Sequence, residues 1–280
     1  MNEHRQIKIM KILVTGGLGF IGSHLVNALK DNHQITIIDN LYNSSIQTAA
    51  EFEKQGIKVF IEDVRRRKKA SGEFDIIFHL SAHTSVARSV DNPLFDVSNN
   101  VLGTIAVIKN YPTKKFVYFS SGAVYGEGQN SRETDRPNPI SPYGFSKLAG
   151  EVYTRMFCKD YLILRLANIY GDGSEAKSEC AVIEHFKKDN PLLIYGEGEQ
   201  TRDFLDVKDL IKIVIHLTNS LVCGTMNIGT GVPTRIIDLA NKMANGRKII
   251  HQNKRKGELI HNIMNVDELK KIIDFPLKKI

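Results

Sequence analysis

The chain has 280 residues, 42% of them hydrophobic, so it can bury one large core and a smaller second one. Its net charge of +7 comes from basic residues scattered along the chain, which favours a solvated surface over a nucleic-acid-binding face. Three widely spaced cysteines indicate neither a disulfide framework nor a metal site, and no apolar run is long enough to span a membrane, so we expect a cytoplasmic protein.

The first predicted elements are a buried strand at 11–14 and an amphipathic helix at 20–30. Between them, Gly16, Gly19 and Gly22 form a G-x-x-G-x-x-G pattern. Glycines at such positions allow a tight turn, a close approach of the backbone to a pyrophosphate, and close packing of helix on strand. The helix N-terminus then offers free N–H groups to the phosphates. The pattern predicts a dinucleotide site.

A second predicted strand, at 34–38, ends next to Asp39. A carboxylate at this point accepts hydrogen bonds from the adenosine ribose and repels a 2′-phosphate. The sequence therefore favours NAD over NADP.

Further apolar runs at 58–61, 75–80, 115–119 and 161–166 alternate with helical stretches. This alternation predicts the α/β class, with a Rossmann-type doubly wound parallel sheet whose ligands bind at the carboxyl ends of the strands. Shorter elements follow residue 168. We expect residues 1–167 to form an NAD-binding Rossmann domain, to which a segment near 204–228 returns, and residues 168–280 to form a smaller C-terminal substrate domain.

A candidate catalytic pair opens the next predicted helix, where Tyr143 and Lys147 are one turn apart. A nearby ammonium lowers the pKa of a phenol, which is ordinarily about 10. Ser120 and Ser121 follow the strand at 115–119 and would supply a hydroxyl to the reacting oxygen. A surface pair on a helix is the alternative, but the preceding dinucleotide pattern favours catalysis.

Taken together, the sequence resembles the extended short-chain dehydrogenase/reductases, and within them the UDP-glucose (UDP-galactose) 4-epimerases, from Met10 to about Phe275. The motifs that carry the resemblance are T-G-G-x-G-F-I-G-S-H at 15–24, I-I-D-N-L at 37–41, H-L-S-A at 79–82, N-N-V-x-G-T at 99–104, S-S-G-A-V-Y-G at 120–126, S-P-Y-G-x-S-K at 141–147, L-R-L-A-N-I-Y-G at 164–171, G-E-Q-T-R-D-F at 198–204, N-I-G-T-G at 227–231 and R-K-G-E at 255–258.

The resemblance implies an isomerase of galactose metabolism that holds NAD tightly, needs no metal and forms a homodimer. It implies catalytic roles for Ser121, Tyr143 and Lys147. The implied NAD contacts are Gly16, Gly19, Phe20, Ile21, Asp39, Asn40, Asp63, Val64, Leu80, Ser81, Ala82, Asn99, Tyr143 and Lys147. The implied contacts to a UDP-sugar are Ser121, Tyr143, Asn168, Tyr195, Arg202, Arg255 and Glu258.

The sequence departs from related enzymes at a few positions. Dehydratases and decarboxylases of this group carry acidic residues where this chain has Gly122 and Ala123, which cannot move a proton, so elimination chemistry is disfavoured. His83 is expected to be a hydrogen-bonding residue of the crevice, not a base. Asn262 occupies, by spacing, a position at which related enzymes restrict bulky sugar substituents.

Several alternatives stay open at this point. We expect the substrates to be UDP-glucose and UDP-galactose. The alternative is another UDP-hexose, either an N-acetylated sugar or a uronic acid. Net reductase activity comes third, because Asp39 disfavours the NADPH that a reductase normally uses. A family member that binds NAD or RNA without turnover is the alternative from a different class.

Overall fold

A central sheet of seven parallel strands organises the computed structural model, which describes residues 8–66, 72–174, 182–220, 222–255 and 258–280. The strand order within these residues is β12-β7-β5-β4-β1-β2-β3. The strands are β1 (Lys11–Thr15), β2 (Gln34–Asp39), β3 (Lys58–Ile61), β4 (Phe74–His79), β5 (Thr113–Ser121), β7 (Tyr161–Leu166) and β12 (Gly224–Ile228). The expected Rossmann-type parallel sheet is confirmed.

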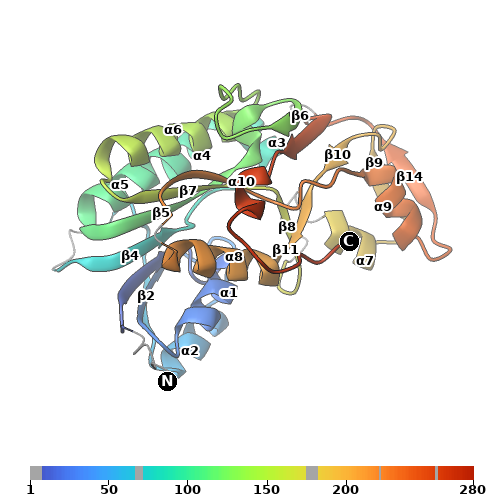
Figure 1. The fold of residues 1–280 in the computed structure, drawn as a ribbon. Coiled ribbons are helices and arrows are strands. Elements are labelled where there is room, and N and C mark those ends of the chain that lie inside the picture. Colours follow the sequence, from blue (N-terminus) through green and yellow to red (C-terminus); the bar gives the residue numbers. More distant parts are fainter. Residues whose placement is uncertain (1–7, 67–71, 175–181, 221, 256–257) are drawn as a thin grey trace, which may run out of the picture.

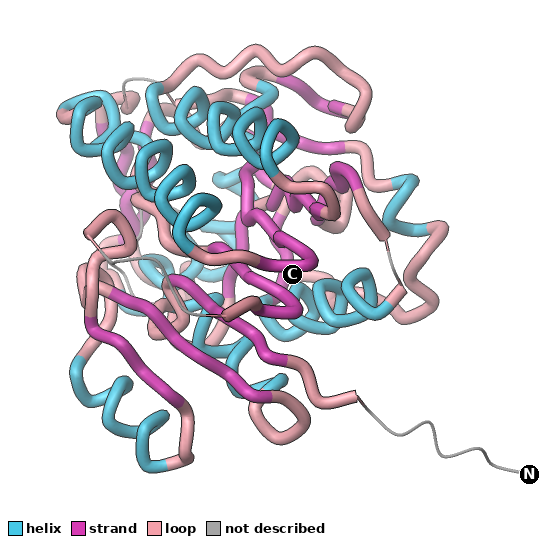
Figure 2. Tube along the Cα trace, turned by 90° about the vertical axis from the view of Figure 1, so that its left-hand side faces the viewer, coloured by secondary structure: helices cyan, strands magenta, loops and turns pink. Residues whose placement is uncertain are grey.

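Helices cover both faces of this sheet (Figures 1 and 2). One face packs against α1 (Phe20–Leu29), α2 (Ile46–Lys54) and α8 (Val207–Asn219), and the other against α5 (Gly103–Asn110) and α6 (Pro142–Phe157). The side chains of each strand alternate between the two faces. In β1, Ile12 and Val14 belong to the first core, whereas Leu13 belongs to the second.

The helical stretch between β4 and β5 is interrupted by a change of helical period. It consists of α4 (Pro93–Val97), a π-helical turn (Ser98–Leu102) and α5, and it is preceded by α3 (Val86–Asp91). The spacing of apolar residues that predicts an α-helix does not distinguish a single π-helical turn within it. Such turns occur frequently at functional sites. This turn carries the buried Asn100 and Asn99, which lines the cleft described below.

The remaining strands form smaller sheets beside the carboxyl ends of the central strands (Figure 1). They are β6 (Gly128–Ser131), β8 (Asn168–Tyr170), β9 (Leu192–Tyr195), β10 (Thr201–Arg202), β11 (Phe204–Asp206), β13 (Thr234–Arg235), β14 (Ile249–Gln252) and β15 (His261–Met264). With α7 (Val182–Lys188) and α9 (Ile236–Met243), they build a second part of the molecule, whose own apolar core draws on β8, β9, β11, β14 and these two helices. Helix α10 (Asp267–Lys270) instead places Leu269 in a core of the central sheet.

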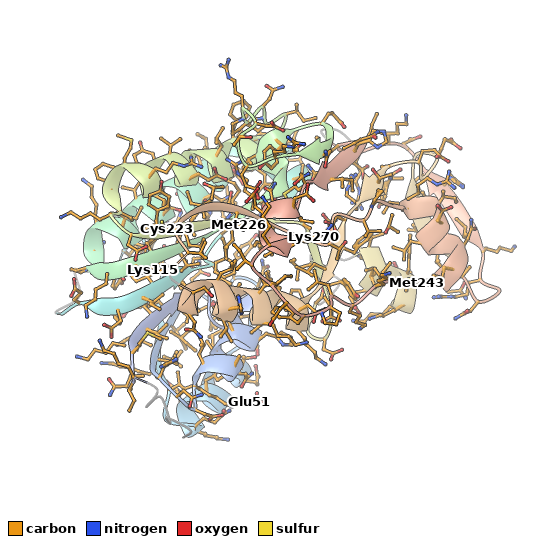
Figure 3. The ribbon with its side chains drawn as sticks, in the orientation of Figure 1. Glu51, Lys115, Cys223, Met226, Met243 and Lys270 are labelled. Atoms are coloured by element: carbon orange, nitrogen blue, oxygen red, sulfur yellow. The ribbon has the colours of Figure 1, made fainter. Side chains whose placement is uncertain are left out.

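Residues late in the chain return to the central sheet. Strand β12 pairs with β7 at the sheet edge, and α8 packs beside α1. At the amino end of the sheet, Lys115 Nζ donates to the carbonyl oxygen of Val222 at 2.8 Å, close to Cys223 (Figure 3). The division of the chain at residue 167 stays a prediction.

No helix in the described part of the chain has the length and apolar character that crossing a bilayer requires.

Candidate active site

A cleft of about 910 Å³ lies along the carboxyl ends of the central strands. All but one of the residues expected at the site line it. They are Gly16, Gly19, Phe20, Ile21, Asp39, Asn40, Asp63, Val64, Leu80, Ser81, Ala82, Asn99, Ser121, Tyr143, Lys147, Asn168, Arg202, Arg255 and Glu258. The exception is Tyr195, which is not among the described lining residues.

The glycine turn between β1 and α1 fits a pyrophosphate. Gly16 has φ of +71°, and a Cβ added there would stand 2.8 Å from the backbone nitrogen of Ser81. A Cβ on Gly22 would stand 2.2 Å from the carbonyl oxygen of Gly16, so the helix lies directly on the turn. No described side chain caps the turn at Gly19, and the first turn of α1 carries no acidic residue. Its N–H groups are therefore open to an anion in the cleft.

Asp39 holds the glycine turn as well as facing the cleft. Its Oδ2 accepts from the backbone N–H of Leu18 at 3.1 Å. Its Oδ1 accepts from the N–H of Leu41 and the hydroxyl of Ser44, each at 2.9 Å. A carboxylate offers about four acceptor sites, so one site remains for a ribose hydroxyl.

The candidate catalytic residues come from β5 and α6. Ser121 ends β5, and its Oγ accepts from the N–H of Ala123 at 3.2 Å. Helix α6 is capped by Ser141, whose Oγ accepts from the N–H of Gly144 at 3.1 Å. Tyr143 and Lys147 follow on this helix, both are buried, and both line the cleft.

Opposing effects act on the pKa of Lys147. Its Nζ lies 4.8 Å from the ring centroid of Tyr118. Burial lowers the pKa of Lys147 to about 8, and the carboxylates of Asp96 and Glu151 oppose that shift. The ammonium therefore persists at neutral pH, where it favours ionisation of a neighbouring phenol.

His83 belongs to a buried polar cluster in the cleft wall. Its Nδ1 is 3.4 Å from Oδ1 of Asp96, and its backbone N–H donates to Asn100 Oδ1 at 2.7 Å. Asn100 Nδ2 donates to that Asp96 oxygen at 3.0 Å and to Ser146 Oγ at 2.9 Å. The other oxygen of Asp96 has no hydrogen-bond partner among the described residues. The cluster joins α4 and the π-helical turn to α6.

The residues expected to bind a diphosphate lie across the cleft on the second part of the molecule. Arg202 Nη2 is 3.3 Å from Glu258 Oε1, and both side chains are mostly buried. The guanidinium carbon of Arg255 lies 3.6 Å from the ring centroid of Tyr195. Tyr195 therefore stands behind Arg255, where it supports a cation of the cleft through its ring face.

Sequence reasoning missed an aromatic and cationic part of the cleft wall. The guanidinium carbon of Arg88 lies 5.4 Å from the ring centroid of Tyr42 and 5.2 Å from that of Phe95, and all three residues line the cleft. They come from α3, α4 and the loop after β2. Only the V-A-R-S stretch that follows His83 could have drawn attention to Arg88.

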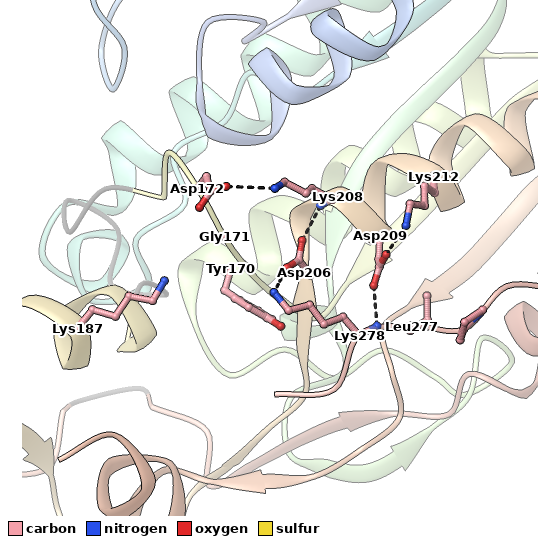
Figure 4. A pocket seen from close by; sticks show the side chains of 11 residues that line it. Tyr170, Gly171, Asp172, Lys187, Asp206, Lys208, Asp209, Lys212, Leu277 and Lys278 are labelled. Atoms are coloured by element: carbon pink, nitrogen blue, oxygen red, sulfur yellow. Dashed lines mark hydrogen bonds and ion pairs between the residues drawn. The ribbon is translucent and has the colours of Figure 1, made fainter. Parts of the chain in front are cut away.

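A second cavity, of about 430 Å³, is lined by charged residues near β8, α8 and the segment 276–278 (Figure 4). Its side chains pair with one another. Lys208 pairs with Asp172 at 3.2 Å, Lys212 with Asp209 at 3.0 Å, and Lys278 with Asp206 at 2.9 Å. It contains none of the candidate catalytic residues, and the larger cleft is the candidate active site.

Comparisons with known proteins show which family and which fold this chain resembles. Residues 12–229 match the NAD dependent epimerase/dehydratase family. The UDP-glucose 4-epimerase of Mycolicibacterium smegmatis is 34% identical over 256 residues, which cover 84% of this chain and 82% of that protein.

Two solved structures share the fold closely. The UDP-N-acetylglucosamine 4-epimerase from Methanobrevibacter ruminantium, in complex with UDP-N-acetylmuramic acid, aligns with a TM-score of 0.85 and 33% identity over 97% of this chain and 94% of that one. The UDP-glucose 4-epimerase of Thermus thermophilus, in complex with NAD, aligns with a TM-score of 0.84 and 28% identity over 94% and 92%.

Proposed function

The chain belongs to the NAD dependent epimerase/dehydratase family, and from this premise we propose that it interconverts UDP-glucose and UDP-galactose at C4. One observation carries the proposal. Ser121, Tyr143 and Lys147 line the same cleft as the glycine turn on one side and Arg202 and Arg255 on the other. A single cleft thus offers a dinucleotide site, a proton acceptor and cations for a diphosphate.

The glycine turn and Asp39 hold NAD in this proposal. Gly16 and Gly19 leave space for the pyrophosphate, and Asp39 accepts from the adenosine ribose. Bound NAD supplies the hydride acceptor and donor for C4 of the sugar.

Tyr143 moves the proton of the sugar. Its phenolate would remove the proton of the 4-hydroxyl while C4 gives up its hydride, and the two losses together would give a 4-keto sugar. The phenol would return the proton when C4 regains a hydride on its opposite face. Lys147 stabilises the phenolate through its charge, and Ser121 bridges the reacting oxygen and the phenol.

The arginines anchor the substrate while its sugar turns over. Arginine pairs with phosphate oxygens through a planar fork of donors. Arg202, Arg255 and Asn168 would hold the diphosphate through both half-reactions, with Glu258 near the nucleoside ribose. The 4-keto sugar can then present its other face to the cofactor without leaving the cleft.

The residues after Ser121 argue against the other reaction of this family. Dehydration needs an acid and a base beside the sugar. Gly122 and Ala123 provide neither. There is also little space for a side chain at residue 122, because a Cβ added at Gly122 would stand 3.0 Å from Asn262 Oδ1. We therefore favour epimerisation without elimination.

UDP-N-acetylhexosamines are the second candidate substrates. Asn262 lines the cleft, and its Nδ2 donates to the carbonyl oxygens of Gly122 and Gly126 at 3.1 and 3.3 Å. Its side chain is thus drawn towards the backbone, which leaves room for a substituent. The Methanobrevibacter ruminantium relative is named for such a substrate.

The test is an assay of C4 interconversion over a panel of UDP-hexoses, with Tyr143→Phe as the matched variant. The phenol acts in the transition state, whereas the diphosphate contacts anchor the substrate. We expect kcat to fall about 10²- to 10⁴-fold in this variant, with UDP-sugar affinity nearly unchanged. Ser121→Ala should have a smaller effect, because water can replace a bridging hydroxyl. Near-normal turnover in Tyr143→Phe would exclude the proposed mechanism.

A further inference from the structure

Behind the candidate catalytic residues lies a buried ion pair that the proposed mechanism does not use. Glu151 is fully buried and Arg165 is 2% exposed. Arg165 Nε donates to Glu151 Oε1 at 2.9 Å and Arg165 Nη2 to Oε2 at 2.8 Å. Two parallel bonds between a guanidinium and a carboxylate fix both distance and orientation.

This pair joins three elements of the site. Glu151 comes from α6, and Ser120 and Arg165 are register partners in β5 and β7. Ser120 Oγ donates to Glu151 Oε1 at 2.7 Å. Its neighbour Ser121 follows directly in the strand. One carboxylate thus connects α6 to both strands at the point where β5 delivers Ser121.

Glu151 also continues the catalytic stripe of α6. Tyr143, Lys147 and Glu151 are spaced by four residues, so they lie on one face of the helix, each a turn from the next. Burial alone would raise the pKa of Glu151, but the hydrogen bonds and charge of Arg165 hold it below its ordinary value. Glu151 is therefore an anion one turn from Lys147.

We infer that Glu151 is a positioning residue of the reaction proposed above, on which this inference rests. It holds α6 on β5 and β7 so that Tyr143 meets Ser121, and it supplies a countercharge to the ammonium of Lys147.

The charged and titratable groups around Lys147 determine how its pKa responds to a substitution of Glu151. The titratable side chains that interact with Lys147 or lie on its face of the helix are Asp96 on α4, His79 on β4, Tyr118 on β5, and Tyr143 and Glu151 on α6. Asp96 and Glu151 both raise the pKa of Lys147 against its burial. Removing the charge of Glu151 lowers that pKa, so Lys147 loses its proton at a lower pH than in the wild type.

The first experiment compares Glu151→Gln with Glu151→Asp and Arg155→Gln. Arg155 is a partly exposed partner of the same carboxylate, at 2.8 Å, and serves as the matched control. In Glu151→Gln we expect kcat to fall about 10- to 100-fold with KM nearly unchanged, and the alkaline limb of the kcat profile to move down by about one pH unit. Glu151→Asp should keep the alkaline limb of the kcat profile at the wild-type pH. Arg155→Gln should match the wild type both in kcat and in the position of this limb.

A second measurement needs no sugar substrate. Calorimetric titration of the full-length protein with NAD⁺, in buffers of different ionisation enthalpy, reports the protons released on binding. The cationic nicotinamide should displace a proton from Lys147, most strongly near the pKa of Lys147. We expect the pH of greatest release to be lower in Glu151→Gln than in the wild type.

The outcomes separate this inference from the proposed function. An inactive wild type would contradict the proposed function and leave the calorimetric test in place. The role of Glu151 would be overturned if the wild type is active and Glu151→Gln shifts neither the alkaline limb of the kcat profile nor the pH of greatest proton release. If Glu151→Gln does not fold, Ser120→Ala decides, because it removes one bond of Glu151 and keeps its charge. We then expect a several-fold lower kcat with an unmoved limb, and an unchanged kcat would reject the positioning role.

Discussion

At the scale of single residues, Asp39 combines two tasks that separate variants can distinguish. It holds the glycine turn through Leu18 and, in our proposal, binds the adenosine ribose. Asp39→Ala should weaken NAD binding by about 1.5–3 kcal/mol, the range for hydrogen bonds to a charged group. Asp39→Asn keeps a side-chain acceptor but not the charge, so it should chiefly reduce discrimination against NADP. Calorimetry with both dinucleotides is the measurement, and equal NAD affinity in wild type and Asp39→Ala would contradict the ribose assignment.

Asn262 is the residue at which we expect sugar selectivity to be set. It lines the cleft, whereas its neighbour His261 bonds Thr201 at 3.0 Å. Asn262→Tyr would fill the space that an acetyl group needs, and overpacking costs about 1–3 kcal/mol. We expect kcat/KM for UDP-N-acetylgalactosamine to fall about 10- to 100-fold and that for UDP-galactose to change little. Unchanged kcat/KM for both sugars would show that Asn262 does not control access.

Residues of a site can be predicted from the sequence where they belong to one local motif. Tyr143 and Lys147 are neighbours on one helix, and Gly16, Gly19 and Gly22 lie close together in the sequence, between the end of β1 and the first turn of α1. The partner of Glu151 was not predicted, because Arg165 comes from another strand and only the register of β5 with β7 brings the two together. Arg255 was predicted for the cleft, but its stacking on Tyr195 depends on the separate pairing of β9 with β14.

At the scale of elements, close packing of α6 on β5 depends on a helical glycine. A Cβ on Gly150 would stand 2.1 Å from the hydroxyl oxygen of Tyr118. Gly150→Ala should therefore lower the free energy of unfolding by about 1–3 kcal/mol through overpacking, although alanine is the better helix former. Gly103→Ala is the matched control, because its Cβ would meet Val64 at an ordinary 3.6 Å.

Denaturant unfolding of both glycine variants gives the comparison. Gly103→Ala should be neutral or slightly stabilising. A Gly150→Ala protein as stable as the wild type would mean that α6 has freedom to shift on β5, and the positioning argument for Glu151 would weaken with it.

The central strands could be predicted from the sequence, whereas the short strands and the π-helical turn could not. Central strands are apolar runs with buried side chains on both faces, so composition predicts them. The short strands β10, β11 and β13 have two or three residues and form only where the chain meets a partner strand. The π-helical turn at Ser98–Leu102 carries no composition signal. Such elements follow from tertiary contacts, which a single sequence does not display.

At the scale of the whole molecule, we propose a homodimer formed through α4, α5 and α6. Large apolar side chains stand exposed on α4, on the π-helical turn that continues into α5, and on α6. They are Leu94, Val97, Leu102, Phe145, Val152, Met156 and Phe157. Helix α6 contacts both α4 and the π-helical turn, so these side chains come from neighbouring elements. An exposed apolar surface of this kind marks an interaction site, and a two-fold axis would pair it with its own copy.

Light scattering at micromolar concentration tests the dimer. We expect twice the 31.5 kDa chain mass for the wild type and the single mass for Met156→Asp, because the charge would be buried at the interface. Val232→Asp is the control, since Val232 is also exposed but lies in the loop between β12 and β13 and belongs to none of these helices. A monomeric wild type would contradict the proposal.

The late return of β12 to the sheet has a consequence for synthesis on the ribosome. Strand β7 ends at Leu166, but its outer neighbour begins only at Gly224. At about 5–20 residues per second, the nascent chain waits on the order of seconds before that neighbour emerges. During this interval β7 presents an unpaired, apolar edge, the kind of surface that recruits other chains. Translation speed between these two strands, and the chaperones that meet the nascent chain there, should therefore influence how much of the protein reaches its native state.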